Sequence, residues 1–475
     1  MFKFHPLGSG QVVHCHTSCV VRASFLRARA DDHAIRGLKS CGDVCVCSTL
    51  SAVNTNMPGS FGHRAPFEGA DRLPDQVGRE GPHRPPPLWE ELQLTRATFR
   101  ASSNAEYWLG RLEQAADRLT NRRTLVRVTQ ARETSAALND AQVVLALPEI
   151  MATDLPAVTV RNPVDPTVLR FLRADDDAVD HVLRGEHVGH VLFGRTARIL
   201  SGLSLDEDDE PGHQRDILER IPWRQGPAWL GGPRPEDAFL LCAPHGPELR
   251  AVVAELLTWL SAETDLPVVV RQALAHHQVA TASPVHHSEH LSRLIIMLGF
   301  IADGALRDQI LAPSLWFTPR NELYRRQFRR VVDTGDFDAW VRFFADGITE
   351  LCKSQIEFIY VLEEIRDKHL DALKRNDGLT RLVNALVGNP VFNTELAAQL
   401  SGLSTRQVHT LVKQLEVKNL VRKWDRNRQV RRKGQQVVRE VPEVVKAISM
   451  LDRVPFRRDR AAFDTDSAPP DPTRE

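Results

Sequence analysis

The chain has 475 residues, of which 42% are apolar and 26% are charged, a composition typical of a folded protein with two or three domains. Lys plus Arg equals Asp plus Glu at 61 each, so the net charge indicates no particular partner. No segment approaches the roughly 20 apolar residues that a membrane helix needs, and the N-terminus lacks the apolar core of a signal peptide. We therefore expect a cytoplasmic protein that makes no membrane contact.

The first part of the chain shows no regular periodicity. We expect residues 1–56 to be an irregular or disordered leader that is not necessarily native, with Met57 as an alternative start. This leader holds a cluster of His and Cys, namely His14, Cys15, His16, Cys19, Cys41, Cys45 and Cys47. Their CxxxC and CxxxCxC spacings differ from the usual zinc knuckle, so zinc binding is the weaker alternative. Residues 57–94 are rich in Gly and Pro and have the composition of a linker.

Residues 95–375 carry repeated helical periodicity and predict one helical domain. Helical patterns occur at 104–120, 141–151, 176–202, 247–261, 266–281, 291–302, 321–332, 336–351 and 354–373. A short strand is expected from Ala238 to Cys242, close to Gly231-Gly232, which predicts a small hairpin. We expect His276 to be a satisfied core residue, and the helically spaced aromatic residues of 337–344 to be core as well.

Residues 376–450 predict a winged-helix domain, and 451–475 a disordered tail. A helix over 379–387 ends at Gly388-Asn389-Pro390, and Thr394 and Ser404 can cap two further helices joined at Gly402. Two helices with a short glycine-containing turn are typical of a helix-turn-helix. The segments 420–424 and 429–432 then predict the hairpin that forms the wing.

This domain is strongly basic. From 406 to 439 there are eleven Lys or Arg and two acidic residues, a local net charge of +9. The residue types on the third helix suit phosphates and base edges in DNA, and the wing adds arginines. The predicted DNA-binding residues are Arg406, Gln407, Thr410, Lys413, Arg426, Arg428, Arg431 and Arg432. A purely structural or docking role for the winged helix is the alternative.

Several local patterns occur in a fixed order ahead of this domain. They include Trp223-Arg224, Trp229-Leu230-Gly231-Gly232, Ala273-Leu274-Ala275-His276 and Ser292-Arg293-Leu294, followed by the aromatic stretch of 335–344. Together, over about residues 85–440, they resemble the Fic family of adenylyltransferases that carry a helical N-terminal extension and a C-terminal winged helix. The resemblance implies a mainly α fold: a Fic-type helical domain with a small β-hairpin flap, followed by a winged helix-turn-helix domain.

The resemblance also implies the chemistry of the site. The family motif HPFx(D/E)GNGRxxR supplies a His base, an acidic metal ligand and a Gly-Asn-Gly turn for the phosphates of ATP. Here Ser283 stands at the position of the base, His287 stands at the acidic position, and the turn glycines are missing. Arg293 matches the final Arg of the motif. Asn321 matches a second family position that contacts the nucleotide, and Tyr324 lies near Asn321 in the sequence.

Two further groups of residues follow from the resemblance. Trp229, Leu230, Gly231 and Gly232 would form the flap, which in the family binds a protein target segment by strand pairing. The family's inhibitory helix carries (S/T)xxxE(G/N), whose Glu blocks productive ATP binding. We align Ser135 and Asn139 with its Ser and Glu.

The leading hypothesis is a catalytically inactive Fic-like protein that regulates by binding through its flap and winged helix and needs no cofactor. A homodimer is an open option. The first alternative is an active AMP transferase that uses ATP and Mg with a rearranged loop. In it His286, His287 or His290 is the base and Glu289 a metal ligand. The second alternative is a domain that binds nucleotide without turning it over.

Overall fold

The computed structural model describes residues 73–86, 88, 92–119, 122–140, 145–153, 155, 166–205, 219–232, 234–318, 321–373, 376–424 and 437–451. They all belong to one compact unit, residues 57–475. The expected leader with its zinc candidates, and all of the expected tail except residue 451, lie outside these ranges. Within them, no helix combines the length and the apolar character that crossing a bilayer requires.

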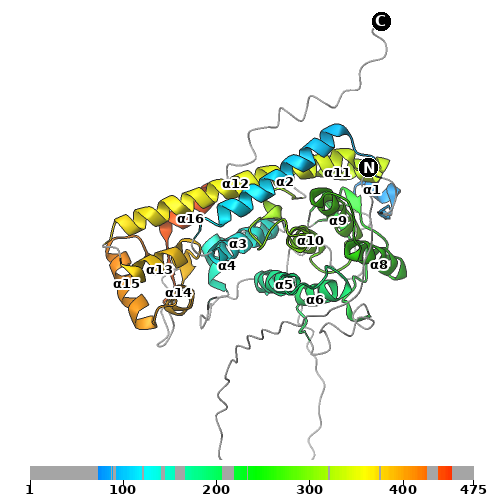
Figure 1. The fold of residues 1–475 in the computed structure, drawn as a ribbon. Helices are drawn as coiled ribbons and strands as arrows, with labels where there is room; N and C mark the ends of the chain where they lie inside the picture. Colours follow the sequence, from blue (N-terminus) through cyan, green and yellow to red (C-terminus); the bar gives the residue numbers. More distant parts are fainter. Residues whose placement is uncertain are drawn as a thin grey trace, which may run out of the picture. The chain divides into compact units, whose positions relative to one another are not determined.

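Two long helices form the backbone of the fold. α2 (Arg96–Ala116) and α12 (Asp338–Asp371) lie side by side (Figure 1). Asp338 at the start of α12 accepts a 2.6 Å hydrogen bond from the backbone N–H of Thr95, the N-cap of α2. The sequence predicted two helices where α12 is continuous, because no Gly or Pro interrupts the chain between the two periodic segments.

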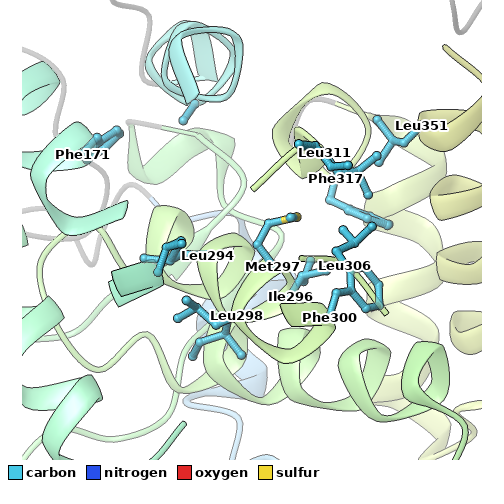
Figure 2. Packing of buried hydrophobic residues seen from close by; sticks show 14 of the residues in the cluster. Phe171, Leu294, Ile296, Met297, Leu298, Phe300, Leu306, Leu311, Phe317 and Leu351 are labelled. Atoms are coloured by element: carbon cyan, nitrogen blue, oxygen red, sulfur yellow. The ribbon is translucent and has the colours of Figure 1, made fainter. Parts of the chain in front are cut away.

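The central pair is α9 (Val268–Ala282) and α10 (Ser288–Ala302), which are buried along almost their whole length. In Figure 2, Leu294 and Leu298 point to one side of α10, while Ile296 and Phe300 point to the other, toward Phe317 and Leu351. A helix that is apolar on every side belongs inside a protein. α10 therefore sets the position of the loop that precedes it.

The remaining helices of this region surround that pair. They are α1 (Asp75–Glu80), α3 (Arg123–Asp140), α4 (Leu147–Thr153), α5 (Pro166–Leu183), α6 (His190–Leu200), α8 (Pro247–Ser261) and α11 (Glu322–Thr334). The single pattern predicted at 176–202 is in fact two helices, α5 and α6, because Gly185 at φ 84° and Gly189 separate them. Neither α1 nor α3 was predicted, and α1 lies within the expected linker.

The expected hairpin is present. β1 (Trp229–Leu230) pairs antiparallel with β2 (Leu240–Leu241), with Trp229 opposite Leu241 and Leu230 opposite Leu240. Gly231 follows β1 at φ 137°, where a Cβ would collide with the carbonyl oxygen of Asp237. The turn therefore requires glycine at this position.

The C-terminal region forms a unit of four described helices with a small sheet. Its elements are α13 (Asp377–Val387), β3 (Val391–Phe392), α14 (Thr394–Ser401), α15 (Thr405–Val417), β4 (Arg422–Lys423), β5 (Arg439–Glu440) and α16 (Pro442–Leu451). The sheet order is β3-β5-β4. Its core is continuous with that of the helical region.

The local predictions for this unit hold with two corrections. Ser404 caps α15 in a capping box with Gln407, as its sequence indicates, but the cap of α14 is Asn393 rather than Thr394. The strand that pairs with β4 is β5, so Arg422 faces Glu440. The return strand predicted at 429–432 lies outside the described residues.

Candidate functional site

The loop that corresponds to the family motif joins α9 to α10. Two of its residues adopt left-handed backbone conformations: Ser283 at φ 44° ends α9, and His287 at φ 57° precedes α10. Neither is glycine, so the loop stores backbone strain at both ends. Ser288, the first residue of α10, closes the turn. Its hydroxyl accepts from the Val285 N–H at 3.0 Å and donates to the Val285 carbonyl at 2.6 Å. One backbone N–H of the loop is thereby satisfied internally.

Arg224 fastens this loop to the segment that leads into the flap. Its side chain is 2% exposed, and burial lowers its pKa. The guanidinium donates to the carbonyls of Ser283 at 2.7 Å, Gly226 at 2.7 Å, Ala282 at 3.2 Å and Ala243. The backbone N–H of Arg224 donates to Pro284 at 3.0 Å, beside the bridge between Trp223 and Val285. The loop and the base of the flap are thus joined by one buried arginine.

Ser283, at the position of the family's base, faces the protein interior. It is buried, and its carbonyl is one of the acceptors of Arg224. Its hydroxyl bonds to the thiol of Cys242, whose pKa burial raises to about 12. A neutral buried thiol is a poor proton acceptor for a serine hydroxyl.

The three histidines of the loop stack among aromatic rings. His286 lies against His287 with ring centroids 3.9 Å apart, and His290 lies against Phe171 of α5, also at 3.9 Å. His287 contacts the same Phe171 edge-on at 5.0 Å. His287 and His290 are buried, whereas His286 and Glu289 are only half-buried. Of the predicted bases, His286 is therefore the most accessible.

His290 belongs to a buried hydrogen-bond network. Its Nε2–H donates to Asp175 at 2.8 Å, and the other oxygen of Asp175 accepts from Gln309 at 2.9 Å. Gln309 in turn accepts from Gln130 of α3 at 3.0 Å. His290 is 2% exposed, so a target hydroxyl cannot reach it in this conformation. This network holds the His290 side chain in its buried conformation.

Arg293 and Glu133 form the second charged centre of the site. Arg293 donates to the hydroxyl of Ser314 at 2.9 Å. Ser314 donates its N–H to Glu133 at 2.8 Å and its hydroxyl to the other carboxylate oxygen. Burial raises the pKa of Glu133, and the positive charge of Arg293 partly offsets this. The glutamate of α3 thus approaches the arginine that matches the last position of the family motif.

The structure places the predicted inhibitory residue away from this charged centre. Asn139 is exposed near the end of α3, whereas Glu133 is buried beside Ser314 and Arg293. The sequence also offers a second register for the inhibitory motif, six residues earlier. Thr129 stands four residues before Glu133 and supplies the (S/T)xxxE spacing, but Thr134 follows where the family has Gly or Asn. That local pattern was the signal the sequence offered.

The other expected nucleotide-binding residues take structural roles. Asn321 caps α11, and its side-chain oxygen accepts from the N–H groups of Leu323 at 3.0 Å and Tyr324 at 3.3 Å. Tyr324 is buried, with its hydroxyl 3.3 Å from Nε2 of His276. The second nitrogen of His276 lies 3.1 Å from the Ser292 carbonyl, and burial lowers the His276 pKa to about 3. His276 is a neutral, satisfied core residue, as expected.

The helix α15 presents a basic face to solvent. Arg406, Gln407, Thr410 and Lys413 are all exposed, while Val408 and Val412 point into the core. Gln407 is engaged in the capping box, and the Thr410 hydroxyl donates to the Arg406 carbonyl at 3.1 Å. Arg406 and Lys413 form no ion pair with any described residue. The wing residues Arg426, Arg428, Arg431 and Arg432 lie outside the described part of the chain.

No group of three His, Cys, Asp or Glu side chains gathers as a metal site within the described ranges. No family model matches the chain, and a search of curated proteins finds no significant match. Among solved structures, the chain is similar to a Fic family protein from Desulfovibrio desulfuricans G20. The identity is 17% and the TM-score 0.44, over 75% of this chain and 98% of that one. That solved protein is named as a member of the family that the sequence resembles. The expected mainly α fold is confirmed by the helices described above.

Proposed function

We propose that the chain is a Fic-like protein without AMP-transfer activity, which acts in the cytoplasm as a regulatory binding protein through its flap and winged helix. The observation that carries this proposal is the loop of residues 283–287, which is closed by Ser288 and held from behind by Arg224. In the family this loop supplies both the base and the phosphate-binding turn. Here its hydrogen-bonding groups are used to hold the loop itself.

Each missing element argues against catalysis for a separate physical reason. Without a base at position 283, a target hydroxyl keeps its proton, which alone costs a factor of about 10²–10⁴ in rate. Without glycines, the turn cannot bring its backbone N–H groups around a phosphate at low cost. Arg293 is already engaged by Ser314 next to Glu133, so we assign the inhibitory position to Glu133. A protein of this kind requires neither ATP nor Mg.

The test is AMP transfer from radiolabelled ATP with Mg to the chain itself and to lysate proteins. We expect no labelled protein above background for the wild type or for Glu133→Gly, which removes the carboxylate near Arg293. Glu133→Gly matters because it distinguishes an enzyme that is repressed by Glu133 from a protein that is inactive.

The rival reading, an active transferase, predicts the opposite result for this pair. Labelling by Glu133→Gly that disappears when His286→Ala is added would overturn the proposal and identify His286 as the base. His286 is chosen because it is the half-buried histidine of the loop.

DNA binding by the winged helix is the second part of the proposal, supported by Arg406 and Lys413 of α15, which are exposed and form no ion pair with any described residue. If both contact phosphates, replacing both with Gln lowers the slope of log affinity against log salt by about 2, at roughly 0.9 per contact. Fluorescence anisotropy with a random-sequence duplex over a salt series measures this slope. Lys446→Gln, which removes one exposed positive charge from α16, is the control and should leave the slope nearly unchanged. An unchanged slope in the double variant would exclude α15 as the phosphate-binding face.

A further inference from the structure

The segment of residues 73–86 lies across the flap. Leu73 and Val77 are buried against Ala238 and Leu241, with Trp229 packed at the side. These side chains form an apolar cluster that is separate from the main core. Every other residue of α1 is exposed, so Val77 is the apolar residue by which this helix packs on the protein. The flap is therefore covered by a small contact from the chain's own N-terminal side.

The segment also makes a backbone hydrogen bond to the flap. β2 continues into Cys242, whose N–H points toward β1 and donates to the Ala228 carbonyl at 2.8 Å. Because successive residues of a strand bond to opposite sides, the Leu241 carbonyl lies on the edge away from β1. The N–H of His83 donates to that carbonyl at 2.9 Å. His83 thus occupies the position that an added strand would take.

Polar contacts hold the middle and the C-terminal end of this segment. Arg329 of α11 pairs with Glu80, and it also donates to the Phe239 carbonyl of the flap at 2.9 Å. Gln278 of α9 donates to the Pro86 carbonyl at 2.6 Å. Arg84 and Glu248 form a longer, exposed pair at 3.9 Å, which contributes little.

We propose that residues 73–86 occupy, within the same chain, the outer edge of the flap to which a protein target binds. This inference rests on the proposed function, in which the flap is a target-docking hairpin. The target must then displace the segment before it can bind. The target is an extended peptide. It donates a backbone N–H to the Leu241 carbonyl, as His83 does now, and places an aliphatic side chain against Ala238 and Trp229, as Val77 does now.

The size of the contact makes displacement feasible. Two aliphatic side chains, one backbone hydrogen bond to the strand and a few polar contacts hold fourteen residues, whose ordering opposes docking. Segments with few buried apolar contacts open at a small fraction of the global free energy. While it is docked, however, the tether gives the segment an effective concentration in the millimolar range, so a weak external peptide competes poorly.

The experiment compares the full-length wild type with Val77→Asp, which places a charge in the apolar cluster. Gly78→Asp is the matched control, because it adds the same charge to the same helix at a position where a Cβ meets nothing within 4 Å. The probe is a fluorescein-labelled peptide with the sequence of residues 73–86, followed by anisotropy without nucleotide. We expect Val77→Asp to bind it at least tenfold more tightly than the wild type or the control. Trypsin should also cleave the variant at least tenfold faster after Arg79.

Three results would each contradict the inference. Equal peptide binding by Val77→Asp and the wild type, with an unchanged circular dichroism spectrum, would overturn the inference, and so would equal rates of trypsin cleavage. Adding Ala238→Glu to Val77→Asp should abolish the gained binding, since Ala238 belongs to the flap; persistence of that binding would place it elsewhere and also refute the inference. None of these readouts involves ATP, so they are independent of whether the chain transfers AMP.

Discussion

Replacing Arg224 with alanine is expected to lower the free energy of unfolding by roughly 3–5 kcal/mol. The substitution removes a buried guanidinium that bonds to four backbone carbonyls, those of Ser283, Gly226, Ala243 and Ala282. A buried acceptor left without a partner costs about 1–3 kcal/mol, and some of these carbonyls will be reached by water in the space that the side chain vacates. Urea unfolding followed by tryptophan fluorescence measures the loss.

Two variants show whether the geometry or merely the charge matters. Arg224→Lys keeps the charge, but its single ammonium group cannot reach all four carbonyls, so we expect about half of the alanine loss. Arg250→Ala removes an exposed arginine from α8 and should change stability by less than about 0.5 kcal/mol. A loss below about 1 kcal/mol for Arg224→Ala would contradict the view that this residue holds the loop to the flap.

The role of Arg224 marks a limit of prediction from the sequence. Trp223-Arg224 and the flap glycines were identified from their order along the chain, and Gly231 was recognisable because its turn requires a glycine conformation. The acceptors of Arg224 include carbonyls 58 and 59 residues away, and any residue type could supply a carbonyl. No side-chain pattern could therefore reveal the partnership. By contrast, the cap of α15 depends on Ser404 and Gln407 three residues apart, and it was predicted from the residue at the cap.

Helix α3 was missed for a different physical reason. Its buried side mixes apolar residues with Thr129, Gln130, Arg132, Glu133 and Thr134, so its apolar periodicity is weak. Most of these polar groups meet a partner from a distant part of the chain; Arg132, for example, donates to Gln355 of α12 at 2.6 Å. From the sequence, Glu133 could therefore not be distinguished from a solvent-exposed glutamate.

The charged centre on α3 gives the second large prediction. Arg293→Met is expected to lower the free energy of unfolding by about 3–5 kcal/mol near neutral pH, because it leaves the buried carboxylate of Glu133 without its positive neighbour. The loss depends on pH. Burial already raises the Glu133 pKa above its unfolded value, and removing Arg293 raises it further. The variant is therefore relatively most stable at low pH and loses stability as the pH rises through that folded pKa. Urea unfolding at pH 5 and pH 8 measures the difference.

A double-mutant cycle separates this charge interaction from a simple packing defect. Glu133→Gln keeps the shape and one of the two acceptor oxygens that face Ser314 but removes the charge, so adding it to Arg293→Met should recover at least about 1–2 kcal/mol at pH 8. At pH 5 the recovery should be smaller than at pH 8, since the raised pKa means that more of the carboxyl in the single variant is protonated at the lower pH. Additive losses at both pH values would mean that Glu133 and Arg293 do not interact electrostatically. Glu133 would then be no better supported than Asn139 as the inhibitory residue.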